Sequence, residues 1–398
     1  MGGQLVTSTW KPRSEPMGAR RFRRPCDYDA FVPDLIGEVQ FNLPIDIAAD
    51  FDDAVSALND LQRNDLSLLR PLAHLLMRTE SIASSRIEEV NVDARRLAHA
   101  EARQRIGRNV GSQAKEVISN IEAMQFAIDC AVNVPQVGLT ELLEVHHRLM
   151  RGRLNSAGRF RSSQNWIGGN DHNPCGADFV PPPPEHVDEL VDDLLAFCNS
   201  DEMPAMFQAA VAHAQFETIH PFEDGNGRTG RALIHIVMRR RRLSEQVVVP
   251  ISLAFSRNRR AYAGGLVAFR SDDMDEWLAT FADAVLQSVS TAARYVELVS
   301  ELLGGWRERL RGHANPRSDA VAWQILSELP ASPVLNRADA IASSDRSSRA
   351  VDQGLRQLEA AEVLIPVEEP PSRHRSWEPA GLLDLIVALE SGEDTRLG

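Results

Sequence analysis

Hydrophobic residues recur at helical spacing along most of the chain, which predicts a mainly α-helical protein. Stretches with this spacing begin near Phe51, Leu72, Glu116, Leu142, Met206, Ala232 and Asp275, and the last continues to about Leu310. Two short β-prone runs, 165–169 and 177–180, flank a loop rich in Gly, Asn and Asp. These runs predict a β-hairpin carried by the helical core.

The two ends of the chain differ from this core. Residues 1–27 are polar, basic and bear Pro and Gly, so we expect a flexible tail. We expect residues 28–110 to form an N-terminal helical segment and residues 111–311 to form the core. Residues 312–398 begin with a linker, and their pattern of three helices and a short two-stranded wing is typical of a winged helix-turn-helix.

The charge of the C-terminal region bears on its partners. Residues 318–379 carry six arginines against ten acidic residues. Because a module that binds duplex DNA normally presents a basic face, this balance does not favour DNA binding. Protein binding and formation of a homodimer stay open as alternatives.

Residues 220–231, His-Pro-Phe-Glu-Asp-Gly-Asn-Gly-Arg-Thr-Gly-Arg, carry the densest set of reactive side chains. Pro221 disfavours the α conformation at His220, so a helix is predicted to end there. The next helix is predicted to start near Arg228. The free N–H groups and the positive dipole end of that helix favour a phosphate.

The glycines and arginines of this segment support the same interpretation. Gly225 and Gly227 are expected to take positive φ, which lets successive N–H groups form an anion-binding nest. Arg228 and Arg231 fall where the helix dipole disfavours cations, and a bound anion would resolve that conflict. Taken singly, each residue of the segment also fits a cap, a turn or a solvated surface position.

This segment resembles the motif of the Fic/DOC family, His-Pro-Phe-x-Asp/Glu-Gly-Asn-Gly-Arg-x-x-Arg, and matches every fixed position. The resemblance implies a mainly α, Fic-type core and transfer of AMP from ATP to a hydroxyl of a target protein, with Mg²⁺. It makes His220 the general base and Asp224 the metal ligand. The residues it implies for nucleotide binding are Phe222, Gly225, Asn226, Gly227, Arg228 and Arg231.

The chemistry fits these roles. An imidazole titrates near neutral pH and can take the proton of an attacking hydroxyl. The leaving pyrophosphate develops negative charge, which arginines and a cation would stabilise. Magnesium prefers oxygen ligands, and one carboxylate with phosphate oxygens is a common set.

A second stretch, residues 81–89, resembles the inhibitory motif of the same family, Ser/Thr-x-x-x-Glu-Gly/Asn. Ser84 and Glu88 stand at the matching positions. The resemblance implies that Glu88 pairs with Arg231 and blocks the γ-phosphate. Glu89 departs from the motif, because Gly or Asn usually supplies the left-handed conformation at a helix end. The alternative is the plain end of an amphipathic helix.

Two further features have counterparts in the family. The predicted hairpin at 165–180 corresponds to a flap on which a target protein docks by strand addition. A plain surface hairpin is the alternative. The segment around Tyr262 resembles the one that contributes to the adenine side of the nucleotide pocket.

Composition narrows the remaining choices. The chain has 398 residues and a formal net charge of −13, which argues against broad affinity for nucleic acid or anionic membranes. Its four cysteines, Cys26, Cys130, Cys175 and Cys198, are scattered, and we expect reduced thiols in a cytoplasmic protein. The alternative functions are removal of AMP, transfer of another phosphate-containing group, or a nucleotide-responsive regulatory binding protein.

Overall fold

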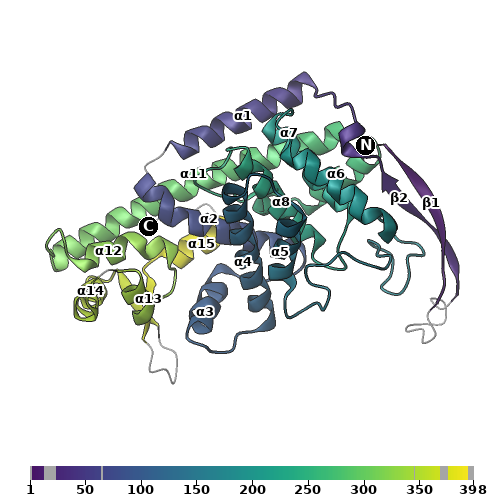
Figure 1. Ribbon diagram of the computed structural model, residues 1–398. Helices are drawn as coiled ribbons and strands as arrows, with labels where there is room; N and C mark the ends of the chain where they lie inside the picture. Colours follow the sequence, from purple (N-terminus) through teal and green to yellow (C-terminus); the bar gives the residue numbers. More distant parts are fainter. Residues whose placement is uncertain (1, 13–23, 64–65, 345, 368–374, 393–398) are drawn as a thin grey trace. The chain divides into compact units, whose positions relative to one another are not determined.

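The computed structural model describes residues 2–12, 24–63, 66–344, 346–367 and 375–392. The fold is mainly helical, as the hydrophobic pattern predicts (Figure 1). The chain folds into two compact units. Unit 1 comprises Met1–Val55, Glu122–Leu243 and Asn258–Ala284, and unit 2 comprises Ser56–Ile121, Ser244–Arg257 and Val285–Gly398. No helix within the described ranges is both long and apolar enough to cross a lipid bilayer.

Unit 1 is built around one buried helix. Its helices are α5 (Leu139–Met150), α6 (Val187–Asn199), α7 (Ala205–Ile219), α8 (Asn226–Arg240) and α10 (Arg259–Arg270), with parts of α1 (Ile45–Gln62), α4 (Ser112–Asn133) and α11 (Met274–His313). Every residue of α7 from Met206 to Ile219 is buried. α7 packs against α6 and α8 (Figure 1), and Trp277 Nε1 donates to its Ala210 carbonyl at 2.9 Å. This core helix leads directly into the motif loop.

The N-terminal segment corrects one expectation. Residues Gly3–Trp10 form strand β1, which pairs antiparallel with β2 (Cys26–Pro33) in the register Gly3 to Pro33. The prediction of a flexible tail is therefore wrong for β1. Its run Leu-Val-Thr-Ser-Thr-Trp is rich in β-branched and aromatic residues, which favour strands. Residues 1 and 13–23 of the expected tail lie outside the described residues.

The cysteines correct another expectation. Cys26 at the start of β2 and Cys175 in the loop after residue 170 form a disulfide, with Cα atoms 6.2 Å apart. Neighbouring contacts hold the same segments together, because Phe31 N–H donates to the Val180 carbonyl at 2.9 Å. Cys130 and Cys198 are buried free thiols, and burial raises the pKa of both. The expectation of four reduced thiols thus holds only for this second pair.

Unit 2 holds the remaining elements. Its helices are α2 (Leu66–Ile87), α3 (Ala94–Arg105), α9 (Ile251–Arg257), α12 (Val321–Glu328), α13 (Arg337–Ala342), α14 (Ser348–Ala360) and α15 (Leu382–Ser391), and its strands are β3 (Leu335–Asn336), β4 (Leu364–Val367) and β5 (Ser376–Pro379). The three strands form an antiparallel sheet in the order β3-β5-β4. α12, α13, α14 and the β4–β5 pair lie where the sequence predicts three helices and a wing.

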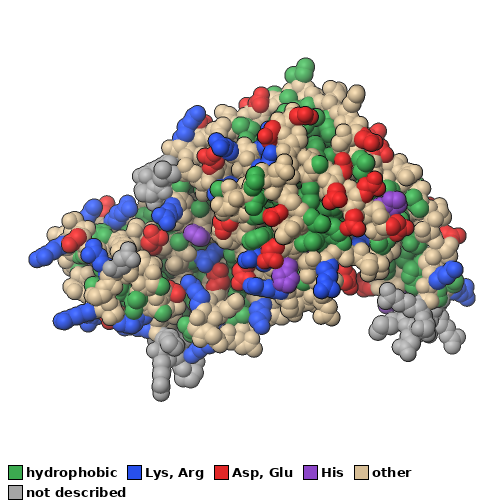
Figure 2. All heavy atoms as spheres, in the orientation of Figure 1, with side chains coloured by type: hydrophobic (Ala, Val, Ile, Leu, Met, Phe, Trp, Pro, Cys, Tyr) green, Lys and Arg blue, Asp and Glu red, His purple; other side chains and the backbone are tan. Residues whose placement is uncertain are grey.

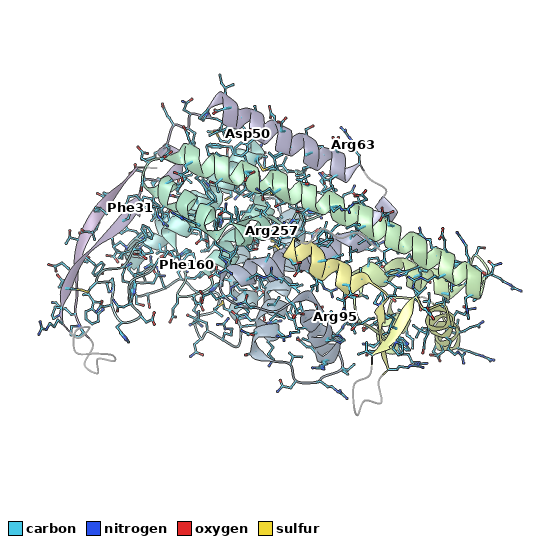
Figure 3. The ribbon with its side chains drawn as sticks, turned by 180° about the vertical axis from the view of Figure 1, so that it is seen from behind. Phe31, Asp50, Arg63, Arg95, Phe160 and Arg257 are labelled. Atoms are coloured by element: carbon cyan, nitrogen blue, oxygen red, sulfur yellow. A yellow bond between two sulfur atoms is a disulfide. The ribbon has the colours of Figure 1, made fainter. Side chains whose placement is uncertain are left out.

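The C-terminal region is not a separate compact unit, because α2 and α3 share unit 2 with it. Arg95 of α3 donates to Glu378 and Asp384, both at 2.6 Å, and Arg257 of α9 donates to the Leu389 carbonyl at 2.6 Å (Figure 3). These contacts join the C-terminal elements to α3 and α9 within unit 2, and the boundary at residue 312 stays a prediction. Long-range ion pairs of this kind leave no trace in hydrophobic periodicity.

One ion pair joins the C-terminal helix to the end of α2. Arg86 lies 3.3 Å from the buried carboxylate of Glu390 on α15. Burial raises the pKa of Glu390 to about 7, and the charge of Arg86 opposes that rise. The pair therefore weakens as Glu390 takes up a proton below neutral pH.

Basic side chains gather over the part of Figure 2 where α12 to α14 lie. A hollow of about 490 Å³ on this surface is lined by Arg337, Arg349, Arg356 and Arg375, together with Asp352 and Glu359. Asp352 pairs with Arg337 at 2.6 Å, and Glu359 pairs with Arg375. The acidic balance of the region therefore coexists with a locally basic face.

Glu89 adopts the left-handed conformation, with φ 62°, although it stands where the inhibitory motif usually has Gly or Asn. A side chain with a Cβ atom is strained there. We therefore expect Glu89→Gly to raise the free energy of unfolding by about 1 kcal/mol, as measured by urea denaturation. Glu89→Ala is the matched control, because alanine retains the Cβ atom and should give no such gain. Equal effects of the two variants would contradict the strain.

Candidate active site

His220 ends α7 as predicted. α7 stops at Ile219, and His220 takes the left-handed conformation, with φ 48° and ψ 59°. Its N–H donates to the Phe216 carbonyl, and its own carbonyl accepts Arg161 Nε, both at 2.9 Å. The imidazole is thereby turned out of the helix at the start of the motif loop.

Phe222 anchors the loop from inside. Its ring is fully buried and stacks on His146, with centroids 3.7 Å apart and an angle of 8° between the planes. His146 accepts the Gly158 N–H at Nδ1 and lies 2.9 Å from the Asp224 carbonyl through Nε2. The ring of Phe222 therefore serves packing, and the expectation that Phe222 takes part in nucleotide binding stays a prediction. His146 is a core histidine beside the exposed His147, as helical periodicity indicates.

Burial of His146 gives the site a pH dependence. Desolvation lowers the pKa of His146 to about 4, although its bond to the Asp224 carbonyl opposes the shift. The unfolded chain, with a pKa near 6.5, takes up this proton first as the pH falls. His146 therefore stabilises the fold above pH 6.5, and this contribution is lost between pH 6.5 and 4.

The free energy of unfolding of the wild type should fall as the pH is lowered from 7 to 5. We expect this fall to be smaller in His146→Gln by about 2 kcal/mol, because the variant lacks the buried imidazole. Urea denaturation at the two pH values measures this difference. His147→Gln is the control, because it makes the same substitution at the neighbouring, exposed position of α5. A His146→Gln variant with the full wild-type pH dependence would rule out the shifted pKa.

The glycines of the loop behave differently from one another. Gly225 precedes α8 with φ 82°, as expected for a residue without a Cβ atom. Gly227 lies inside the first turn of α8, which begins at Asn226. The predicted nest of two left-handed glycines is therefore wrong at Gly227, because the helix starts two residues earlier than expected. The first N–H groups of α8 and its positive end still face this loop.

Two adjacent carboxylates in the loop have separate surroundings. Glu223 accepts the Ser156 hydroxyl at 2.7 Å. Asp224 accepts the Gly225 N–H at 2.6 Å, and its side chain is exposed. Within the described ranges, no three His, Cys, Asp or Glu side chains cluster as metal ligands. One exposed carboxylate fits Mg²⁺, which usually takes one or two protein oxygens and completes its shell with phosphate and water.

Two buried arginines occupy the first turns of α8. Arg228 is 2% exposed and Arg231 is 1% exposed. Arg231 Nη1 donates to the Tyr262 hydroxyl at 3.4 Å, and His213 Nε2 lies 2.8 Å from the same hydroxyl. Burial, reinforced by the charge of Arg231, lowers the pKa of His213 to about 3. Two positive charges thus lie beside the positive end of a helix, which is the arrangement for a polyanion.

The surroundings of Tyr262 bear on the expectation that its segment contributes to the adenine side of the nucleotide pocket. Tyr262 is 6% exposed, and its ring centroid lies 5.9 Å from that of His213 and 6.2 Å from that of Trp277, which are themselves 5.8 Å apart. This burial leaves little of the ring surface for stacking on an adenine base, and the adenine-side role of Tyr262 stays a prediction. Tyr262 contributes its hydroxyl to Arg231.

The predicted hairpin is reduced to a single antiparallel bridge between Ile167 and Phe179. Ile167 N–H donates to the Phe179 carbonyl at 2.8 Å, and Phe179 N–H donates back at 3.2 Å. Glycines at 168, 169 and 176 take positive φ, which interrupts regular strand geometry. We call residues 165–180 the flap.

Arg161, just before the flap, and Asn165, its first residue, contact the motif loop, although sequence patterns did not single them out. Arg161 is 5% exposed and donates to the carbonyls of His220 and Pro182. Asn165 Nδ2 lies 2.9 Å from His220 Nδ1 and 2.9 Å from the Phe222 carbonyl. Arg161 could have been found as a buried arginine in a loop, because a buried guanidinium needs several hydrogen-bond acceptors.

The residues of the second motif lie in unit 2. Ser84 is buried in the last turns of α2, and Glu88 follows the helix with an exposed side chain. Asn120 of α4 donates to the Ser81 carbonyl at 2.9 Å and lies 3.1 Å from Ser85 Oγ. The end of α2 is thus fixed by side-chain bonds within its own unit.

The site thus combines a histidine in a left-handed turn, an exposed carboxylate and a helix start with two buried arginines. Residues 136–238 match the model of the Fic/DOC family, and residues 49–129 match that of the Fic/DOC family N-terminal region. These matches identify a Fic/DOC domain and the N-terminal region of that family within the chain.

Curated relatives of this chain are named adenylyltransferases. The chain is 32% identical over 133 residues to "Protein adenylyltransferase fic-1" of Caenorhabditis briggsae, covering 31% of this chain and 24% of the relative. It is 29% identical over 202 residues to a "Probable protein adenylyltransferase" of Aquifex aeolicus, covering 50% of this chain and 57% of the relative. The chain thus spans less than two thirds of either relative.

A crystal structure of a Fic family protein from Desulfovibrio desulfuricans G20 shares the fold. The TM-score is 0.52 at 21% sequence identity, and the match covers 86% of this chain and 98% of that chain. At this identity the similarity establishes the fold alone.

Proposed function

We propose that this protein transfers AMP from ATP to a hydroxyl side chain of a target protein. The single observation that carries the proposal is the placement of His220 in a left-handed turn, six residues before the start of a helix that holds buried Arg228 and Arg231. This arrangement sets a base beside a polyanion site. The names of the curated relatives support the same activity.

Each residue has a role in this proposal. His220 accepts the proton of the attacking hydroxyl. The start of α8, Asn226, Arg228 and Arg231 bind the phosphates and stabilise the charge that develops on the leaving pyrophosphate. Mg²⁺, when bound by Asp224, would supply further charge neutralisation between the phosphates. The flap holds the target segment near His220 through backbone hydrogen bonds.

Regulation and the C-terminal region complete the proposal. Glu88 inhibits the enzyme by competing with the γ-phosphate for Arg231, and Ser84 positions the helix end that carries Glu88. The elements from α12 to β5 form a winged-helix-like module that binds a protein partner or a second copy of the chain. Weak DNA binding remains the less favoured role for this module.

Labelled ATP tests the activity. The protein is incubated with Mg²⁺ and with ATP that carries radiolabel on the α- or the γ-phosphate. Incorporation of α-label alone into protein supports AMP transfer, whereas incorporation of γ-label indicates phosphorylation. Release of AMP from a pre-modified protein would identify the reverse activity. Nucleotide binding without any incorporation would favour a nucleotide-responsive binding protein.

The two adjacent carboxylates test the metal site. We expect Asp224→Ala to lower the rate of α-label transfer about 100-fold at saturating Mg²⁺, because no cation then neutralises the phosphates. Glu223→Ala is the matched control, since Glu223 bonds Ser156 instead. Titrating Mg²⁺ against transfer rate in both variants makes the measurement. If only the Glu223 variant showed a weaker response to Mg²⁺, the metal ligand would be Glu223 and the assignment to Asp224 would be wrong.

A further inference from the structure

The imidazole of His220 is held by two side-chain amides. Asn165 Nδ2 lies 2.9 Å from His220 Nδ1, and Asn226 Nδ2 lies 3.2 Å from the same nitrogen. Asn165 belongs to the flap, and Asn226 begins α8. The ring is therefore held on one side by the flap, where the proposed target segment binds, and on the other by the start of α8, where the proposed phosphates bind.

The orientation of the Asn226 amide follows from its backbone partners. Its Oδ1 accepts the Phe222 N–H at 2.8 Å, so the opposite end must be nitrogen. That nitrogen also donates to the Phe222 carbonyl at 2.8 Å. An amide has one donor end and one acceptor end, so Asn226 presents N–H to His220 Nδ1.

The Asn165 amide is oriented by the same carbonyl. Its Nδ2 lies 2.9 Å from the Phe222 oxygen, which can only accept. A flipped amide would set two acceptors against each other. Asn165 therefore also presents N–H to His220 Nδ1, while its buried Oδ1 has no hydrogen-bond partner within the described residues.

Two donors at one nitrogen fix the tautomer of the ring. Nδ1 must carry a lone pair, and the proton of the neutral imidazole then resides on Nε2. The nitrogen that can take a proton is Nδ1. We propose that Asn165 is a positioning residue that keeps His220 Nδ1 unprotonated as the base, at the place where the target hydroxyl arrives.

This inference rests on the proposed function and specifies its proton transfer. The O–H bond of the target side chain breaks, and its proton passes to His220 Nδ1. The oxygen forms a bond to the α-phosphorus, the bond from the α-phosphorus to the bridging oxygen breaks, and pyrophosphate leaves. The hydroxyl then takes the place of the Asn165 N–H at Nδ1, so Asn165 must release the ring when the target binds.

A matched pair of substitutions at neighbouring positions tests the role. Asn165→Asp replaces the N–H donor by a carboxylate that favours a proton on Nδ1. Gln164→Glu makes the same chemical change one residue earlier, where the amide donates to the Asn165 and Pro181 carbonyls and does not contact His220. Both proteins are prepared with ¹⁵N-labelled histidine, and His220→Ala identifies the His220 signals.

In the wild type, the NMR signals of His220 should show an unprotonated Nδ1 and a protonated Nε2 at neutral pH. In Asn165→Asp, Nδ1 should become protonated, and the acid limb of the pH–rate profile for transfer should move up by about one pH unit. Gln164→Glu should leave the tautomer and the profile unchanged. The affinity for ATP should be the same in all three proteins.

The inference is overturned by a proton on Nδ1 of wild-type His220, which requires no variant to detect. It is also overturned if Asn165→Asp and Gln164→Glu have equal effects on the tautomer and the profile. Absence of any transfer in the wild type would remove the proposed function. The NMR signals of His220 would still decide the tautomer in that case, so the two failures are distinguishable.

Discussion

Replacing His220 with alanine is expected to lower transfer of α-labelled AMP about 1,000-fold, within the range typical of a lost general base. The affinity for ATP should remain close to that of the wild type, because the proposed phosphate-binding groups are the start of α8 and its arginines. Rates of label incorporation and calorimetric titration with ATP measure the two quantities separately.

His147→Ala is the matched control for this substitution. His147 is exposed on α5. Its substitution removes an imidazole from the same unit without changing the motif loop. Its transfer rate should equal that of the wild type. Undiminished labelling by His220→Ala would remove His220 from the chemistry and leave the loop as an anion-binding site only.

Substitution of Glu88 by glycine should raise the transfer rate about tenfold, a typical size for a coupling between an inhibitor and a substrate site. The proposed competition for Arg231 would end, and the arginine would be available to the γ-phosphate. Because Glu88 is exposed, the change removes little packing. ATP with Mg²⁺ should then raise the Tm of the variant more than that of the wild type, since stabilisation follows occupancy of the folded state.

Glu89→Gly is the control at the neighbouring position. It restores the residue type usual in the inhibitory motif and relieves the positive φ of Glu89. It should therefore retain inhibition or strengthen it. If Glu88→Gly labels protein no faster than the wild type, residues 84–88 are only the end of a helix.

Local rules predicted much of the loop that leads into α8. Pro221 acts on the residue before it, and Gly225 lacks a Cβ atom, so the end of α7 and the turn before α8 follow from short-range sterics. The wrong prediction at Gly227 also concerns short-range structure. A helix start depends on which residue supplies the cap, and Asn226 already lies within α8.

Contacts between distant segments were beyond the sequence patterns. Asn165 meets His220 across 55 residues, and Arg161 reaches the same turn across 59. Phe222 matched the motif, but only its stack on His146 shows that its ring serves packing. Periodicity within a helix reports which face is buried and carries no information about the partner on that face.

The disulfide between Cys26 and Cys175 has a topological consequence. It closes residues 26–175 into a covalent ring, and this ring includes the segment with Ser84 and Glu88. A single proteolytic cut between residues 27 and 174 would open the ring without separating the chain into two molecules. Only reduction would release the pieces. In the oxidised protein, the segment with Ser84 and Glu88 therefore stays covalently linked to the rest of the chain after such a cut.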